Sequence, residues 1–147
     1  MSSPAVPPVQ RVVLVVREDL PVGQAVNAGT VLGASVGSLL DLPLGADGTD
    51  ASGICYGGIV TTPVPVLAAG EKELTRLFRA ANTDERLVAL SLTETARLAR
   101  TYEAYLTSLA ETHEADLDIA ALIVAGPRNR VTRATKHLSL FAVDSEK

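Results

Sequence analysis

The sequence predicts an α/β protein: a three-layer α/β/α sandwich around a mixed, mostly parallel four-stranded sheet. Two observations support this. Residues 12–16 and 119–125 are apolar runs bounded by charged or turn residues, the pattern of strands buried on both faces. Between them, segments with helical periodicity alternate with shorter apolar runs. At 147 residues the chain has the length of one domain. We place that domain at residues 11–147, after a flexible tail at residues 1–10.

The composition argues against nucleic acid as a partner. Aromatic residues make up only 3% of the chain and its formal net charge is −4. It therefore lacks both a base-stacking surface and a general attraction for phosphate backbones. One basic cluster still offers a local phosphate contact, or is an ordinary solvated surface: Arg128, Arg130, Arg133 and Lys136.

The sequence also predicts a soluble, cytoplasmic protein. A single cysteine, Cys55, excludes an internal disulfide and fits a reducing compartment. Residues 1–10 lack the basic start and long apolar core of a signal peptide. No apolar run approaches the roughly 18 residues of a membrane span. The acidic residues near His113 match no metal-ligand spacing, so we expect no metal and no cofactor.

The first unit is a strand over residues 11–17 followed by a helix over about 24–40. Gly29, Gly33 and Gly37 are spaced four apart, which places them on one helix face. Each glycine costs about 1 kcal/mol relative to alanine in a helix interior. Something must therefore approach this face closely: the sheet, a partner helix or a ligand.

The middle of the chain begins with a long Pro/Gly/Asp/Ser-rich segment, residues 41–56, which we expect to be functional or mobile. Residues 59–67 alternate as a strand does. Because Pro63 and Pro65 cannot donate to a sheet ladder, an edge position is expected. Residues 71–81 form an amphipathic helix, with these residues inward: Leu74, Leu77, Phe78 and Ala81.

A third strand is expected over residues 87–92. Ser91 to Glu94 match a capping box, which predicts a helix reaching about His113. Residues 119–125 form a second central strand, stopped by Gly126-Pro127, before a short helix at 131–138 and an extended piece at 138–143. The long helix carries this apolar stripe: Leu98, Tyr102, Tyr105, Leu106 and Leu109.

Two blocks resemble the type 2 peptidyl-tRNA hydrolases, the archaeal and eukaryotic type. They are Arg11–Leu20 with Gly23, and Ile123–Pro127 continuing through Val131-Thr132 and His137–Phe141. The middle is more similar to a bacterial family of unknown function with the same fold, through Asp50–Gly53, Gly57–Ile59 and the helix carrying Tyr102 and Tyr105. The resemblance covers most of residues 11–141. It implies a mixed four-stranded sheet flanked by helices, often in a homodimer.

The chain departs from the hydrolases at their catalytic positions. In an ungapped alignment their helix lysine falls on Val26, their glutamine on Thr30 and their histidine on Gly33. Their Asp-Ala-Gly-Arg-Thr segment has no counterpart around residues 90–97. Only Asp19 and the C-terminal block are retained. Since valine and glycine cannot activate an ester carbonyl, we do not expect peptidyl-tRNA hydrolysis by the family's own machinery.

Ligands of open α/β sheets bind beyond the carboxyl ends of strands, which here means the corner after the first strand. The candidate ligand-binding residues are Glu18, Asp19, Asn27 and Thr30, with Asp50, Ser52, Cys55 and Tyr56 on a loop that closes over the cleft. Each has a structural alternative. Asp19 can tether the turn, Asn27 and Thr30 can be simply exposed, and Asp and Ser are ordinary turn formers.

The leading hypothesis is a non-hydrolase that binds a small molecule in this cleft. Two alternatives remain open. One is a hydrolase of an aminoacyl or peptidyl ester that uses other residues; for Cys55 as nucleophile, His113 or His137 must lie within hydrogen-bond reach. The other is a dimeric structural or interaction module in which the glycine face of the first helix packs against a second copy.

Overall fold

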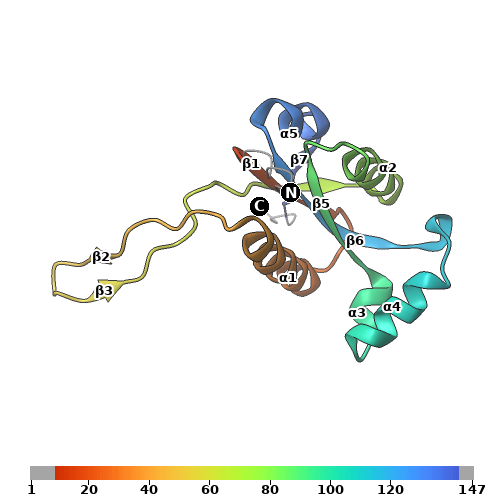
Figure 1. Cartoon of the computed structure of the whole chain (residues 1–147), viewed down its shortest axis with the longest axis horizontal. Coiled ribbons are helices and arrows are strands. Elements are labelled where there is room, and N and C mark those ends of the chain that lie inside the picture. The colour runs from red at the N-terminus through yellow and green to blue at the C-terminus, as the bar shows by residue number, and fades with distance from the viewer. Residues whose placement is uncertain (1–8, 143–147) are drawn as a thin grey trace, which may run out of the picture.

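A computed structural model describes residues 9–142, and predictions that fall on residues 1–8 and 143–147 lie outside it. Of the expected tail, only residues 9 and 10 are described, and the Gln10 amide donates to the Gly126 carbonyl at 3.0 Å. In chain order the elements are β1 (Arg11–Arg17), α1 (Val22–Leu40), β2 (Gly48–Thr49), β3 (Cys55–Tyr56), β4 (Val66–Ala69), α2 (Glu71–Asn82), β5 (Val88–Thr93), α3 (Glu94–Leu98), α4 (Tyr102–Ala110), the 3-10 turn η1 (Glu114–Asp116), β6 (Ile119–Gly126), α5 (Arg128–Thr135) and β7 (Ser139–Leu140) (Figure 1).

The main sheet is mixed and has five strands, in the order β5-β6-β1-β4-β7. Only β1 and β4 are parallel neighbours, and the other three neighbouring pairs are antiparallel. The expectation of a four-stranded, mostly parallel sheet is therefore wrong in strand number and in strand direction. The α/β class and the mixed character of the sheet are confirmed.

The strand directions follow from where the connections run. A parallel pair needs a crossover from one end of the sheet to the other, and α1 supplies it between β1 and β4. The segment with α3 and α4 instead stays at one end of the sheet, so β6 returns antiparallel beside β5 (Figure 1). A helix between two strands thus predicts a parallel pair only when it covers a face of the sheet.

Helices cover both faces of the sheet. Side chains of β1 alternate, so that Val12, Leu14 and Val16 pack with α1 while Val13 and Val15 pack with α2 and α5. All eight residues of β6 are buried, which places the centre of the core on this strand. The expected second central strand is confirmed.

Two element predictions in the middle of the chain are wrong. β4 begins at Val66, after the prolines rather than around them, and lies inside the sheet between β1 and β7. The helix expected up to His113 is broken, since Ala99 to Thr101 leave the helical conformation and Thr101 caps α4 through a 3.0 Å bond from the Ala104 amide. The cap of α3 is Thr93, not Ser91, which belongs to β5.

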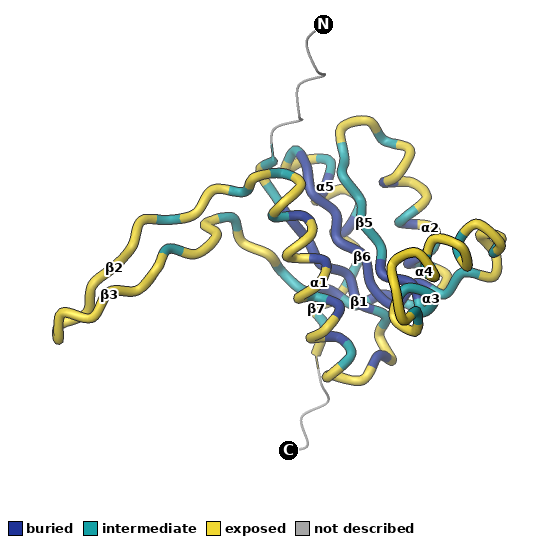
Figure 2. The backbone as a smooth tube through the Cα atoms, turned by 60° about the horizontal axis from the view of Figure 1, so that its bottom comes forward, coloured by how far each residue is buried: buried dark blue, intermediate teal, exposed yellow. Residues whose placement is uncertain are grey.

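Residues 43–61, which we call the arm, form a two-stranded ribbon that projects from the body (Figures 1 and 2). One antiparallel register runs from the Thr61–Pro43 bond at the base, through the Leu44–Val60 bridge and the β2–β3 pair, to the bond between the Asp50 amide and the Ile54 carbonyl. No arm residue is buried. The segment expected to be a loop is therefore an ordered ribbon without a core.

Candidate functional site

Asp19 belongs to an ion cluster at the carboxyl end of β1. Nε of Arg17 lies 2.6 Å from Oδ1 of Asp19, and Nη1 lies 2.9 Å from Oδ1 of Asp118. Glu94 approaches the same guanidinium at 3.8 Å. The hydrogen bond from Arg17 lowers the pKa of Asp19. Asp19 therefore tethers the turn after β1, while its neighbour Glu18 is exposed.

Asn27 and Thr30 lie on the exposed side of α1. The Thr30 hydroxyl donates to the Val26 carbonyl at 2.8 Å. Thr30 also lines a groove of about 390 Å³, which we call the α1 groove. Its other lining residues are all apolar: Leu14, Val16, Val22, Ala25, Val26, Gly29, Val64, Val66 and Phe141.

The glycine face of α1 has two parts. A Cβ on Gly29 would lie 3.0 Å from Cδ2 of Leu14, so close packing on the sheet explains this glycine. A Cβ on Gly33 or Gly37 would meet nothing within 4 Å. The structure thus accounts for one of the three glycines and leaves the other two facing open space.

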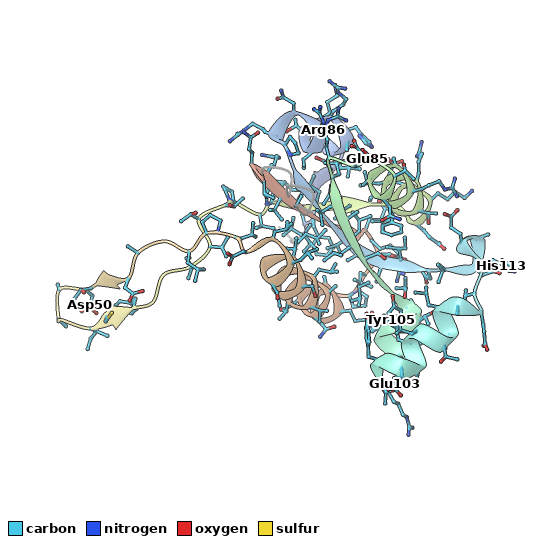
Figure 3. The ribbon with its side chains drawn as sticks, in the orientation of Figure 1. Asp50, Glu85, Arg86, Glu103, Tyr105 and His113 are labelled. Carbon is cyan, nitrogen blue, oxygen red and sulfur yellow. The ribbon has the colours of Figure 1, made fainter. Side chains whose placement is uncertain are left out.

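The four predicted loop residues lie at the tip of the arm rather than over a cleft. Oδ1 of Asp50 accepts the amides of Ser52 and Ile54 at 2.8 and 2.9 Å, and Oδ2 accepts the Tyr56 hydroxyl at 2.7 Å. Gly53 completes the turn at φ 84°, which favours glycine. These residues hold their own turn, and in a single copy they cover no site. Figure 3 shows Asp50 at the far end of the molecule.

The residues proposed for nucleophilic catalysis are also far apart. Cys55 is exposed on the arm beside Asp50, while His113 lies at the opposite end of the molecule (Figure 3). Nε2 of His137 lies 2.7 Å from Oε1 of Glu73 on α2. Neither histidine is thus placed to activate Cys55, so one copy of the chain does not contain the Cys–His pair that the nucleophile hypothesis requires.

A large hollow lies beside β5, and we call it the β5 groove. It has a volume of about 620 Å³, within the range of small-molecule sites. β5 is an edge strand, so this groove runs along its free side. The lining comes from five elements, α1, α2, β5, α3 and α4, and from the α3–α4 bend: Val31, Leu32, Ser35, Phe78, Ala89, Leu90, Ser91, Leu92, Ala96, Ala99, Arg100, Thr101, Tyr102 and Tyr105.

The polar groups of the β5 groove include several without protein partners. Within residues 9–142, Arg100 forms no ion pair, and Ser91 and the hydroxyls of Tyr102 and Tyr105 form no side-chain hydrogen bond. The two tyrosine rings lie 5.5 Å apart at 49°. Burial, followed by the effect of Tyr102, raises the pKa of Tyr105. The groove therefore combines an apolar floor with a cation and three uncommitted hydroxyls.

Sequence reasoning missed this groove because it assigned Tyr102 and Tyr105 to the apolar stripe of a continuous helix. Leu98, Tyr102 and Leu106 are in fact exposed. The available signal was Thr101, an N-cap residue type placed directly before a Tyr-x-x-Tyr spacing. Because the helix breaks at Ala99, Tyr102 and Tyr105 lie beside β5 at the edge of the sheet.

Arg130 of the basic cluster lies 3.0 Å from Asp84, and Arg128, Arg133 and Lys136 are exposed on or just after α5. Among residues 9–142, no three side chains of His, Cys, Asp or Glu gather as metal ligands. Within the same range, no helix has the length and hydropathy required to cross a bilayer.

The fold and the groove define a mixed α/β protein with a hollow along its sheet edge and a projecting arm. The chain belongs to the family described as "Protein of unknown function (DUF2000)", which matches residues 10–142. A solved protein of unknown function from Agrobacterium tumefaciens strain C58 is similar in structure, with a TM-score of 0.79 and 17% sequence identity. The similarity covers 90% of this chain and 97% of that chain, and it shows the fold alone. No curated protein matches the sequence.

Proposed function

We propose that this DUF2000 protein binds a small anionic molecule with a flat apolar body in the β5 groove. The observation that carries the proposal is the uncommitted Arg100 guanidinium beside an apolar hollow with two tyrosines. Binding sites for small molecules are concave and mostly apolar, with few polar groups that fix orientation. The β5 groove has this composition, whereas the α1 groove offers almost no polar contact.

The proposal keeps small-molecule binding but moves the site predicted from the sequence. Of Glu18, Asp19, Asn27 and Thr30, only Thr30 lines the α1 groove and none lines the β5 groove, while Asp50, Ser52, Cys55 and Tyr56 lie on the arm. In this proposal the framework of a type 2 peptidyl-tRNA hydrolase has been retained for binding. The β1–α1 unit and the Gly126-Pro127 end of β6 support that relationship.

The ligand within the groove is expected to make two kinds of contact. Its ring packs against Tyr102 and Tyr105, whose faces also favour aromatic neighbours. Its anionic group pairs with Arg100, which presents a planar set of donors suited to carboxylate or phosphate. Ser91 on β5 supplies a further hydroxyl to the groove lining.

Two matched probes test the charge contact. Indole-3-acetate and uncharged indole-3-acetamide have nearly the same shape, so their affinities separate ring binding from anion binding. We expect the carboxylate to bind about five-fold more tightly, the upper range for an exposed ion pair. Arg100→Met should remove that difference. Arg128→Met, an exposed arginine outside the groove, should preserve it.

Thermal unfolding tests the contact between the ring of the ligand and the two tyrosines. At a hundred-fold excess over Kd, a ligand should raise Tm by about 5–10 °C. Tyr102→Ser should reduce this shift, whereas Leu106→Ser, on the same helix but outside the lining, should not. If a panel of aromatic carboxylates and phosphates gives no shift, the proposal is wrong. Release of amino acid from charged tRNA above the buffer rate would instead favour the hydrolase alternative.

A further inference from the structure

The arm lacks what normally stabilises a two-stranded ribbon. No residue from 43 to 61 is buried, and none belongs to either core cluster. An isolated hairpin of this kind is at best marginally stable in water. Yet the arm exposes large apolar side chains along its length: Leu44, Ile54, Tyr56, Ile59 and Val60. A surface of this kind requires a covering partner.

The region around the arm also has an unusual charge distribution. Residues 20–70 include no lysine or arginine and only three carboxylates, although the chain has 13 basic and 17 acidic residues. Two of the three, Asp47 and Asp50, accept hydrogen bonds from amides of the arm itself. Depletion of charge is a property of interface cores. The arm and the neighbouring helix therefore form one extended, almost uncharged surface.

Helix α1 supplies the second half of this surface. Its nineteen residues include no charged side chain, and Val22, Val26 and Val31 are exposed on it. Val22 and Val26 line the α1 groove together with Val64, three residues after the end of the arm. The exposed side of the helix is thus joined, through this groove, to the segment that follows the arm.

The dimensions of the two elements match. From base to tip the arm spans nine residues, 43–51, or about 30 Å of extended chain. The nineteen residues of α1 extend about 28 Å. One arm is therefore long enough to cover the whole exposed side of one α1.

We propose that the occupant is a second copy of this chain, with the arm of each copy lying along α1 and the α1 groove of the other. Each chain contains both halves of the contact, so two copies close it with two-fold symmetry. Nineteen arm residues and the ten residues lining the groove reach the size of a specific interface, roughly 20–30 residues per side. This inference does not depend on the β5 groove.

Three matched substitutions test the proposal by mass in solution. Val26 on α1, Ile59 on the arm and Leu98 on α3 are 63%, 79% and 69% exposed, so lysine at each position should leave the fold intact. Sedimentation equilibrium should give twice the 15.3 kDa chain mass for the parent and for Leu98→Lys. Val26→Lys and Ile59→Lys should each shift the mass toward a monomer.

Cys55 makes the contact between copies directly observable. It is the only cysteine and lies at the arm tip, so a nitroxide can be attached there without other changes. In the parent dimer the docked arm should give an immobilised spectrum. The Val26→Lys substitution is on α1 and not on the arm. It should nevertheless sharpen the spectrum, because it releases the arm of the partner copy from α1.

Several outcomes would overturn the proposal. A parent protein that stays monomeric at every accessible concentration excludes the second copy. A dimer that tolerates both lysine substitutions has its interface elsewhere, with the free edge of β5 as the next surface to test. A dimer lost in Val26→Lys with an unchanged nitroxide spectrum shows helix pairing without arm docking.

Discussion

The hydroxyl of Tyr56 donates a 2.7 Å hydrogen bond to Oδ2 of Asp50, and this bond closes the tip of the arm. Asp50 also accepts two amides through its other oxygen. The Tyr56 bond is the largest single cause that lowers the pKa of Asp50, and the amides add to it, while the carboxylate in turn raises the pKa of Tyr56. One ionised side chain thus fixes the shape of an element that has no core.

This relationship predicts acid sensitivity at the arm tip. Because the pKa of Asp50 is lowered in the folded protein, its ionised form stabilises the tip at pH values above the ordinary carboxyl pKa of 3.8. That contribution is lost as the pH falls through the lowered value. Hydrogen exchange at the Ser52 and Ile54 amides should accelerate there, relative to arm amides without a carboxylate partner. Asp50→Asn should abolish this pH-dependent difference between the two amides and the other arm amides, and an unchanged difference would contradict the assignment.

A pair of adjacent glycines provides a test of the arm ribbon. A Cβ on Gly58 would lie 1.7 Å from the carbonyl oxygen of Gly45 on the opposite strand, so Gly58→Ala must separate the strands. A Cβ on Gly57 would meet nothing within 4 Å. Amide protection along β2 and β3 should therefore be lost in Gly58→Ala and kept in Gly57→Ala. Equal protection in the two variants would mean that the ribbon is not formed in solution.

The ion cluster at the end of β1 should contribute to stability. Arg17→Met removes the half-buried guanidinium that joins Asp19, Glu94 and Asp118, and we expect a loss of about 1–3 kcal/mol in the free energy of unfolding. Arg17→Lys keeps the charge but not the planar donors, so it should cost less. Urea denaturation measures both. Equal stability of all three proteins would show that the cluster is only a surface contact.

The strand at the centre of the core should tolerate truncation least. Leu122 on β6 is completely buried and packs on the face of the sheet that α2 covers. Leu122→Ala should therefore lower the free energy of unfolding by about 2–5 kcal/mol. Ile59→Ala, on the exposed arm, should change the stability of the monomeric domain by less than about 0.5 kcal/mol. Thermal unfolding of the two variants in the Val26→Lys background, which the dimer proposal expects to be monomeric, checks the contrast.

Local patterns were sufficient to predict the elements of the core. The apolar runs of β1 and β6 and the amphipathic spacing of α2 are confirmed at nearly the expected bounds. In each case the signal lies within the segment, because burial on one or both faces dictates the residue pattern. The direction of β6 could not be predicted from a local residue pattern, because it depends on whether α3 and α4 cross the sheet or remain at its end.

The candidate sites show the same division. Asp50, Ser52 and Tyr56 have the composition of a turn, and a turn is what they form; the sequence could not show that the turn lies on a projecting ribbon. The β5 groove brings together residues from positions 31 to 105, which no local pattern connects. The helix break at Ala99 to Thr101 contributes to that groove, and there Thr101 caps a second helix after the one that Thr93 caps.

The Thr61 amide donates to the Pro43 carbonyl at 3.1 Å, so the two ends of the arm meet where it leaves the body. The arm is thus an excursion within the connection between α1 and β4, and it takes no part in the packing of the sheet. Because its ends already lie together, a tight turn of a few residues could join them with little strain on the body. A change in the length of the arm would then alter the surface that is available to a partner molecule, without altering the fold of the domain.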